Sequence, residues 1–264
     1  MKKIMVDLNK KQQIFVAKNY NNLCKEVTEK IYKLSEKGIK ENGCFTIVLS
    51  GGSTPQGIYL LMANDFYRNK FQWKFIHFFW GDERCVPICD PNSNYRMISD
   101  ILLTKIDIPR VNIHEIAINT NNPTSTAHIY ESELISYFNL SEKEFPRFDL
   151  ILLGLGSDGH TASLFPQSSN IFEDTFQLVI STVGGEPNLK RITLTIPVLN
   201  NAKNLIWIVS GSLKAQIVKK ALENNVDDID NMDNKNLLPK HVLLKNGNTF
   251  WFLDRDASCL LNLK

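Results

Sequence analysis

The 264-residue sequence has no hydrophobic run long enough to cross a membrane. Its opening segment, MKKIMVDLNK, contains lysines but no apolar stretch of the kind that follows them in a secretion signal. An excess of one charge is also missing. The 30 basic and 28 acidic residues leave a formal net charge of +2, which is too small to draw the protein to nucleic acid or to an anionic membrane. We therefore expect a cytoplasmic protein with no nucleic-acid and no membrane partner.

Cysteine is scarce and its spacing is irregular. The five cysteines, Cys24, Cys44, Cys85, Cys89 and Cys259, form an odd and scattered set. Reduced thiols are therefore favoured over a disulfide framework. Cys85 and Cys89 have three residues between them and lack the second ligand pair that is typical of structural zinc sites. We expect no metal site at this pair.

The sequence also lacks the signatures of several large enzyme classes. It contains neither the Walker pattern nor the dinucleotide-binding glycine pattern, so a nucleotide ligand is not implied. No glycine-rich segment has the G-x-S-x-G spacing of a serine nucleophile elbow, and no repeat of fixed period occurs. The composition, 43% hydrophobic and 22% charged, is that of an ordinary globular protein.

The sequence does contain short apolar runs that lead directly into glycine and polar residues. These runs cover residues 45–49, 75–80, 149–153 and 205–209. Such runs are typical of strands buried on both faces of a parallel sheet. Helical patterns lie at 22–36, 55–64, 94–103, 124–138 and 213–224. We predict one α/β domain over residues 1–264, with an open, mostly parallel, Rossmann-like sheet and helices on both faces.

Some local features are predicted as well. The segment Ser53-Thr54-Pro55 suits a helix start, with a hydroxyl as the cap and proline at the first helical position. A β-hairpin is predicted around Asn246-Gly247-Asn248. Polar loops are expected at 138–146, 170–175 and 226–238.

Loops at the carboxyl ends of parallel strands form the ligand crevice of an open α/β sheet. Gly51, Gly52, Ser53 and Thr54 lie between a strand and a helix start, where backbone N–H groups and the helix dipole favour an anion. An ordinary tight turn is the alternative. Lys214 lies in a first helical turn and Arg191 at a strand start, and each taken alone is better interpreted as a surface charge. The alternative is that both bind a phosphate, which would offset the unfavourable place of Lys214 in the helix dipole and accept a forked contact from Arg191.

The segment from Gly154 to His160 is more specific, because it places Asp158 and His160 on a glycine-rich loop after a buried strand. Histidine suits general-base work near neutral pH, although a loop histidine can also be merely structural or solvated. Asp82 and Arg84 follow another strand. One interpretation is a salt-bridged surface turn. The other is a functional pair, in which the Asp82 carboxylate orients a sugar hydroxyl or transfers protons and the Arg84 guanidinium polarises a carbonyl.

The remaining histidines receive no role. His77 lies inside an apolar run and is interpreted as a core residue, and His114, His128 and His241 occur in unremarkable contexts. The aromatic residues 78–80 are predicted to be strand core.

Several segments together resemble the 6-phosphogluconolactonase family, within the larger group that includes glucosamine-6-phosphate deaminases. The matching segments are Leu49-Ser50-Gly51-Gly52-Ser53-Thr54-Pro55, Phe78-Phe79-Trp80-Gly81-Asp82-Glu83-Arg84, Ser93-Asn94-Tyr95, residues 154–166, residues 191–195, and Gly211-Ser212-Leu213-Lys214. The deaminases instead resemble Asn-Met-Asp-Glu-Tyr at the second segment and Asp-Gly-His-Ile-Ala-Phe-Asn-Glu-Pro at the fourth. This contrast favours the lactonase.

The resemblance implies hydrolysis of 6-phospho-D-glucono-1,5-lactone without a metal or another cofactor. His160 would be the general base with Asp158 as its partner, and Arg84 would lie beside the reacting carboxyl. Gly51, Gly52, Ser53, Arg191 and Lys214 match sugar-phosphate-binding positions. The alternatives are an isomerising deaminase and a sugar-phosphate sensor without catalysis. We expect a monomer whose partner is a small sugar-phosphate lactone.

Overall fold

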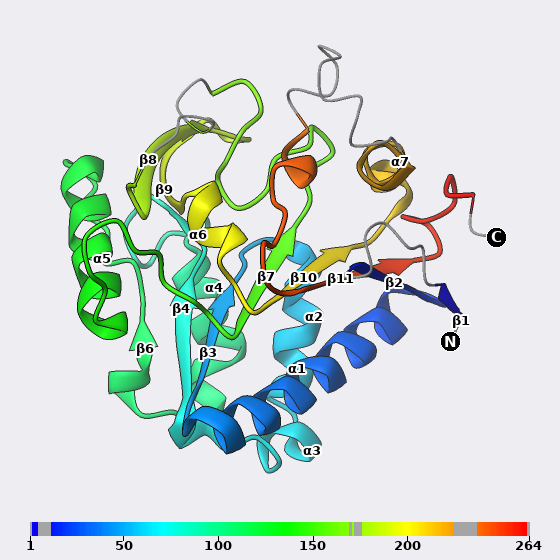
Figure 1. Ribbon diagram of the computed structural model, residues 1–264, viewed down its shortest axis with the longest axis horizontal. Coiled ribbons are helices and arrows are strands. Elements are labelled where there is room, and N and C mark those ends of the chain that lie inside the picture. Colours follow the sequence, from blue (N-terminus) through cyan, green and yellow to red (C-terminus); the bar gives the residue numbers. More distant parts are fainter. Residues whose placement is uncertain (1, 5–11, 169–170, 172–175, 224–236, 263–264) are drawn as a thin grey trace.

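The computed structural model describes residues 2–4, 12–168, 171, 176–223 and 237–262 (Figure 1). Its main sheet has eight strands in the order β1-β2-β11-β10-β7-β3-β4-β6. Among the described strands of this sheet, only the β1–β2 pair is antiparallel. The strands are β1 (Lys2–Ile4), β2 (Gln12–Ala17), β3 (Phe45–Leu49), β4 (Ile76–Trp80), β6 (Ile113–His114), β7 (Leu150–Gly154), β10 (Asn204–Val209) and β11 (Asn248–Asp254). The predicted open, mostly parallel sheet is confirmed.

A second, antiparallel sheet has the order β5-β9-β8 and lies near the carboxyl ends of the main strands (Figure 1). Its strands are β5 (Asp82–Arg84), β8 (Val179–Gly184) and β9 (Leu189–Leu194). Because β5 begins two residues after β4 ends, the second sheet grows directly out of the first. This connection brings the charged residues of β5 and β9 to the carboxyl edge of the main sheet.

Helices surround the sheets. They are α1 (Tyr20–Asn42), α2 (Ser53–Met62), α3 (Asp65–Arg68), α4 (Asn94–Ile101), α5 (Pro123–Phe138), α6 (Ile196–Asn200) and α7 (Ala215–Glu223). Helix α1 packs on α2 and on strands β2, β3 and β11, and α5 packs on β8 and β9. Short 3₁₀ turns complete the connections, among them Ser212–Lys214 just before α7.

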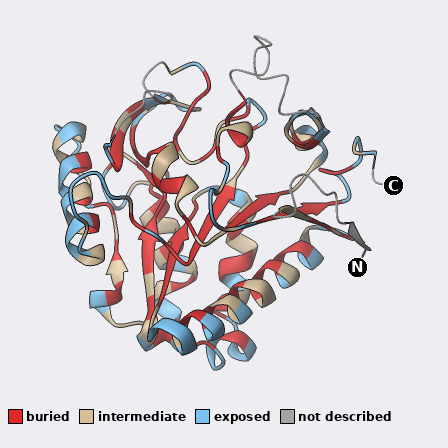
Figure 2. Ribbon diagram, in the orientation of Figure 1, coloured by how far each residue is buried: buried red, intermediate tan, exposed pale blue. Residues whose placement is uncertain are grey.

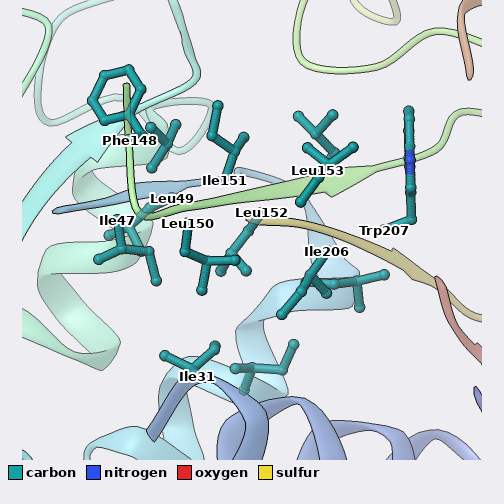
Figure 3. Packing of buried hydrophobic residues seen from close by; sticks show 14 of the residues in the cluster. Ile31, Ile47, Leu49, Phe148, Leu150, Ile151, Leu152, Leu153, Ile206 and Trp207 are labelled. Atoms are coloured by element: carbon teal, nitrogen blue, oxygen red, sulfur yellow. The ribbon is translucent and has the colours of Figure 1, made fainter. Parts of the chain in front are cut away.

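The core lies on both faces of the central strands, which explains why their sequences are apolar at most consecutive positions. All five residues of β3 are buried. Figure 3 shows Leu150 and Leu152 of β7 pointing towards Ile31 of α1, whereas Ile151 and Leu153 point to the opposite side. Figure 2 shows the central strands buried and the outer faces of the helices largely exposed. A strand covered on both faces has no solvent-facing positions for polar residues.

Most predicted elements are confirmed with small shifts. The β-hairpin predicted around residues 246–248 and the hydroxyl cap predicted for helix α2 were wrong. Asn248 instead begins β11, a strand that pairs in parallel with β10 and β2. Helix α1 is longer than predicted and ends before Gly43, whose φ of +79° closes the helix in the left-handed region that glycine favours. The predicted loops at residues 170–175 and 226–238 lie largely outside the described residues.

A hydrogen-bonded histidine pair joins strands β4 and β6 at the edge of the main sheet. His77 Nδ1 lies 3.1 Å from His114 Nε2, and His114 Nδ1 lies 2.8 Å from Glu133 Oε1. Burial, together with the nearby His114, lowers the pKa of His77 from 6.5 to about 4. His77 is half-buried rather than a core residue, although its ring is hydrogen-bonded as was predicted for a satisfied histidine.

Acidification is expected to weaken the fold through His77. The unfolded chain takes up this proton at higher pH, so the stabilisation is complete above pH 6.5 and is lost as the pH falls towards about 4. The full shift corresponds to about 3 kcal/mol, which partial exposure reduces to on the order of 1 kcal/mol. Urea unfolding at about pH 7.5 and about pH 5 should show that His77→Asn loses less stability than the wild type. An equal loss in both proteins would contradict this assignment.

Candidate functional site

A pocket of about 190 Å³ lies beyond the carboxyl ends of β3 and β7. These strands are neighbours at the point where the sheet order reverses, with β4 and β6 on one side and β10 and β11 on the other. Open α/β sheets bind ligands at such a switch point. Of the residues predicted for the site, the pocket is lined by Gly51, Gly52, Ser53, Thr54, Asp82, Arg84, His160, Arg191 and Lys214. Asp158 does not line it but contacts His160.

The amino terminus of α2 opens into this pocket. Its N-cap is Gly52, with φ of +90° and no side-chain hydrogen bond to the helix. The predicted hydroxyl cap was therefore wrong, and Pro55 is the third helical residue rather than the first. Helix N–H groups without a side-chain cap remain available to a ligand, and the helix dipole favours an anion there.

Two tyrosines hold this loop from behind. The Tyr59 hydroxyl, which is fully buried, accepts from Ser50 N at 3.0 Å and donates to Ser50 O at 2.8 Å. The Tyr20 hydroxyl donates to Thr54 O at 2.9 Å and accepts from Gly57 N at 3.0 Å. Burial raises the pKa of Tyr20 to about 12, so the hydroxyl keeps its proton for this bond. Both contacts fix the backbone on either side of Gly51 and Gly52.

Three cations face the pocket. Within the described part of the chain, Arg84, Arg191 and Lys214 form no ion pair with a carboxylate. Arg191 Nε donates to Gly184 O at 2.8 Å, and Arg84 donates to Asn92 O. The buried Nε of Arg84 has no hydrogen-bond partner among the described residues.

The electrostatics of these cations favour an anionic ligand. Burial lowers the pKa of Arg191, and the positive charge of Arg84 lowers it further, whereas Asp82 acts in the opposite direction. Burial also lowers the pKa of Lys214, with Asp158 opposing it. A shift in this direction means that the charged form lacks full compensation. A phosphate beside the α2 amino terminus would supply the missing negative charge.

His160 and Asp158 form a hydrogen-bonded pair at the pocket wall. His160 Nδ1 lies 2.6 Å from Asp158 Oδ1, and His160 N donates to the same oxygen at 3.2 Å. Because an ionised carboxylate only accepts, we assign the proton to Nδ1, which leaves the lone pair on Nε2. Burial acts to raise the pKa of Asp158, but the hydrogen bond and charge of His160 outweigh it, and the pKa is lowered.

Gly156 makes room for this pair. A Cβ at this position would lie 2.1 Å from His160 Nδ1 and 2.3 Å from Asp158 Oδ1. The loop is further tied by Gly156 N, which donates to His160 O at 2.8 Å, and by Thr161 Oγ1, which donates to Gly154 O at 2.8 Å. The glycine is thus required by close approach.

Replacing Gly156 by alanine is expected to displace the His160–Asp158 pair. If His160 reacts with substrate, a displacement of about 1 Å should lower kcat by up to about 100-fold. Ser157→Ala, on the exposed part of the same loop, is the matched control and should leave kcat unchanged. Kinetics and thermal unfolding of both variants would check this. Wild-type kcat in a folded Gly156→Ala variant would show that the geometry of the pair is not critical.

Asp82 is held from two sides. It is buried, and its Oδ2 accepts from Ser163 Oγ, while Asn94 Nδ2 donates to its carbonyl at 2.9 Å and approaches Oδ1 at 3.4 Å. Thr182 Oγ1 in turn donates to Ser163 O at 2.9 Å. The interpretation as a salt-bridged surface turn is wrong, because Asp82 is buried and the carboxylate is engaged by neutral donors.

No role was predicted for Asn94, Ser163 or Ala162. Asn94 and Ala162 line the pocket, and Ser163 is fully buried against Asp82. Ala162 has φ of +48°, a left-handed conformation that is uncommon outside glycine. The sequence signal for Asn94 was only its place directly after Ser93, a good helix cap, which marks it as the first residue of a helix.

Among the described residues, no set of three or more His, Cys, Asp and Glu side chains is arranged to hold a metal ion. None of the helices in the described ranges combines the length and the apolar composition that a membrane span needs.

Fold and site together define an α/β protein with a cation-lined pocket at the switch point of its sheet and a carboxylate-oriented histidine in the pocket wall. The chain belongs to the family described as glucosamine-6-phosphate isomerases/6-phosphogluconolactonase, which matches residues 18–251.

Individual relatives agree with this assignment. The chain is 38% identical over 221 residues to a 6-phosphogluconolactonase of Synechocystis, covering 84% of this chain and 86% of the relative. It is 36% identical over 261 residues to a probable 6-phosphogluconolactonase of Arabidopsis thaliana, covering 95% and 94%. The solved 6-phosphogluconolactonase of Trypanosoma brucei is similar with a TM-score of 0.82 at 27% identity, covering 94% of this chain and 98% of the other.

Proposed function

We propose that this protein hydrolyses 6-phospho-D-glucono-1,5-lactone to 6-phosphogluconate, in the oxidative branch of the pentose phosphate pathway. One observation carries the proposal: His160, which is hydrogen-bonded to Asp158, lines the same pocket as three cations that form no ion pair in the described chain. A general base and an anion site in one pocket suit a phosphorylated, hydrolysable substrate. The names of the relatives support the lactone as that substrate.

In the proposed mechanism the phosphate binds the α2 amino terminus, Arg191 and Lys214, which places the lactone carbonyl near His160. The Nε2 lone pair of His160 takes a proton from water while the water oxygen attacks the carbonyl carbon. Arg84 or loop N–H groups stabilise the resulting oxyanion. As the tetrahedral intermediate collapses, the ring C–O bond breaks and the imidazolium returns its proton to the leaving oxygen. Asp158 keeps the ring oriented throughout.

Two other functions are less well supported. An isomerising deaminase is disfavoured because the Trp80-Gly81-Asp82-Glu83-Arg84 segment differs from the Asn-Met-Asp-Glu-Tyr of the deaminases. Ammonia release from glucosamine 6-phosphate would reveal that activity. A sensor without catalysis is disfavoured because the Asp158-Gly159-His160 segment is intact and hydrogen-bonded.

The test is a fast assay on freshly made 6-phosphogluconolactone, because such lactones also open spontaneously. The protein should accelerate opening well beyond an uncatalysed control, and the rate should survive exhaustive chelation, since a base, a positioned water and an oxyanion site suffice. Absence of acceleration would refute the proposed function. Loss of rate on chelation, restored by a divalent ion, would refute the metal-free mechanism.

We further propose that the chain acts as one domain, as a cytoplasmic monomer, and without a cofactor. The single family match over residues 18–251 supports one domain, and the small net charge of +2 argues only against a nucleic-acid or membrane partner. Light scattering at assay concentrations would test the monomer.

A further inference from the structure

Glu83 is a buried carboxylate that does not line the pocket, and only 2% of its surface is exposed. Its Oε1 accepts from Arg84 N at 2.7 Å and from Asn94 N at 2.8 Å. Its Oε2 accepts from Tyr95 N at 2.7 Å and from Ser93 Oγ at 3.1 Å. Both oxygens are therefore used within the protein, and the group is not free to bind a ligand.

These contacts fix the start of helix α4. The first N–H groups of a helix have no partner inside the helix. Glu83 accepts from the first two helical residues, Asn94 and Tyr95, and the Ser93 hydroxyl accepts from Arg96 N at 3.1 Å. A negative charge at this end also interacts favourably with the helix dipole. Burial raises the pKa of Glu83, and the hydrogen bonds from Tyr95, Asn94 and Arg84 N–H act against that rise.

The residue that α4 presents to the pocket is Asn94. Its Nδ2 donates to Asp82 O, and its Oδ1 lies so close to Gly51 that a Cβ there would be 1.9 Å away. Asn94 thus lies between Asp82 and the glycine loop at the α2 amino terminus. Any shift of the first turn of α4 would move this side chain and loosen both neighbours.

We infer that Glu83 is a positioning residue for the reaction: its carboxylate ties α4 to β5 and thereby sets Asn94 between Asp82 and Gly51. The inference rests on the proposed function for the identity of the reaction. Glutamine cannot replace this carboxylate, because its NH₂ group would face the N–H groups that now donate to an oxygen. The charge-assisted hydrogen bonds would be lost together.

The chain offers a matched control. Glu131 Oε2 accepts from Leu178 N at 3.0 Å and from Val179 N at 3.1 Å, and this residue does not line the pocket. Glu83→Gln should lower kcat/KM by about 10- to 100-fold, whereas Glu131→Gln should keep it near the wild-type value even if it lowers the thermal stability. Unchanged kcat/KM in folded Glu83→Gln, or an equal loss in both variants, would overturn the inference.

A double-mutant cycle tests the route through Asn94. If Glu83 acts by placing Asn94, the Glu83→Gln/Asn94→Ala variant should be little worse than Asn94→Ala alone. Losses that multiply would show that Glu83 does not act through Asn94. Should Glu83→Gln fail to fold, Glu83→Asp keeps the charge but draws it back by one methylene, and the same comparisons apply.

A binding measurement separates this inference from the proposed function. If the wild-type protein does not hydrolyse the lactone, the proposed function fails. Calorimetric binding of 6-phosphogluconate by the same variants then decides the positioning role. Weaker binding in Glu83→Gln, but not in Glu131→Gln, would support the role of Glu83, and equal binding in both variants would refute it.

Discussion

His160→Asn is expected to lower kcat by about 100- to 10,000-fold, the usual contribution of a positioned general base. Asparagine can keep a hydrogen bond to Asp158, since its Nδ2 lies near the place of the histidine Nδ1, but it has no group that can take a proton from water. KM should change far less, because the phosphate contacts lie on Arg191, Lys214 and the α2 amino terminus. Steady-state kinetics on fresh lactone, corrected for spontaneous opening, would measure both constants.

The pH dependence of kcat/KM gives a second test of His160 as the general base. Protonation of His160 removes the Nε2 lone pair, so kcat/KM of the wild type should fall on the acid side. Asp158 should remain ionised through this limb, because the hydrogen bond and charge of His160 outweigh burial and lower its pKa. His160→Asn should lose the limb. Near-wild-type turnover in the folded variant, with the limb still present, would exclude His160 and make Asp82 the next base to test.

Lys214→Ala is expected to weaken substrate binding by about 1.5–3 kcal/mol, the value of one charged hydrogen bond. This loss corresponds to an increase in KM of about 10- to 150-fold, with a smaller change in kcat. The physical reason is that Lys214 lines the pocket and has no ion-pair partner in the described chain. Its positive charge is therefore available to a bound phosphate. The variant should also lose discrimination between the phosphorylated and the non-phosphorylated lactone.

Lys220→Ala is the matched control, because Lys220 is an exposed lysine of α7 that does not line the pocket. It should leave KM at the wild-type value. An unchanged KM in Lys214→Ala, with retained discrimination against the non-phosphorylated lactone, would remove Lys214 from the phosphate site.

The central strands could be predicted from the sequence with little error. The apolar run 45–49 coincides with β3, and the run 205–209 is one residue shorter than β10. Such runs succeed because burial on both faces demands apolar residues at consecutive positions. Strands β2 and β8, in which buried and partly exposed positions mix, gave no such signal.

Of the local contacts in the site, some were predicted from the sequence and others were not. The close pairing of Asp158 and His160 follows from their separation by a single glycine. The capping of α2 did not follow, because Ser53 and Thr54 were expected to cap a helix that in fact begins at Ser53 itself. Helix starts are decided by the backbone of the preceding loop, and here Gly52 in a positive-φ conformation begins the helix earlier.

The sequence by itself determined which residues are buried in strands, which loops are rich in glycine, and which side chains can carry a proton or a charge, since all three depend on residues within a few positions of each other. Only the tertiary structure decided that Ser163 and Asn94 engage Asp82, that Glu83 holds the start of α4, and that Arg191 and Lys214 face one pocket. These partners lie up to 81 residues apart in the hydrogen bonds that join them. They meet because the strand order reverses between β3 and β7, and that order is set by packing of the whole sheet rather than by any local pattern.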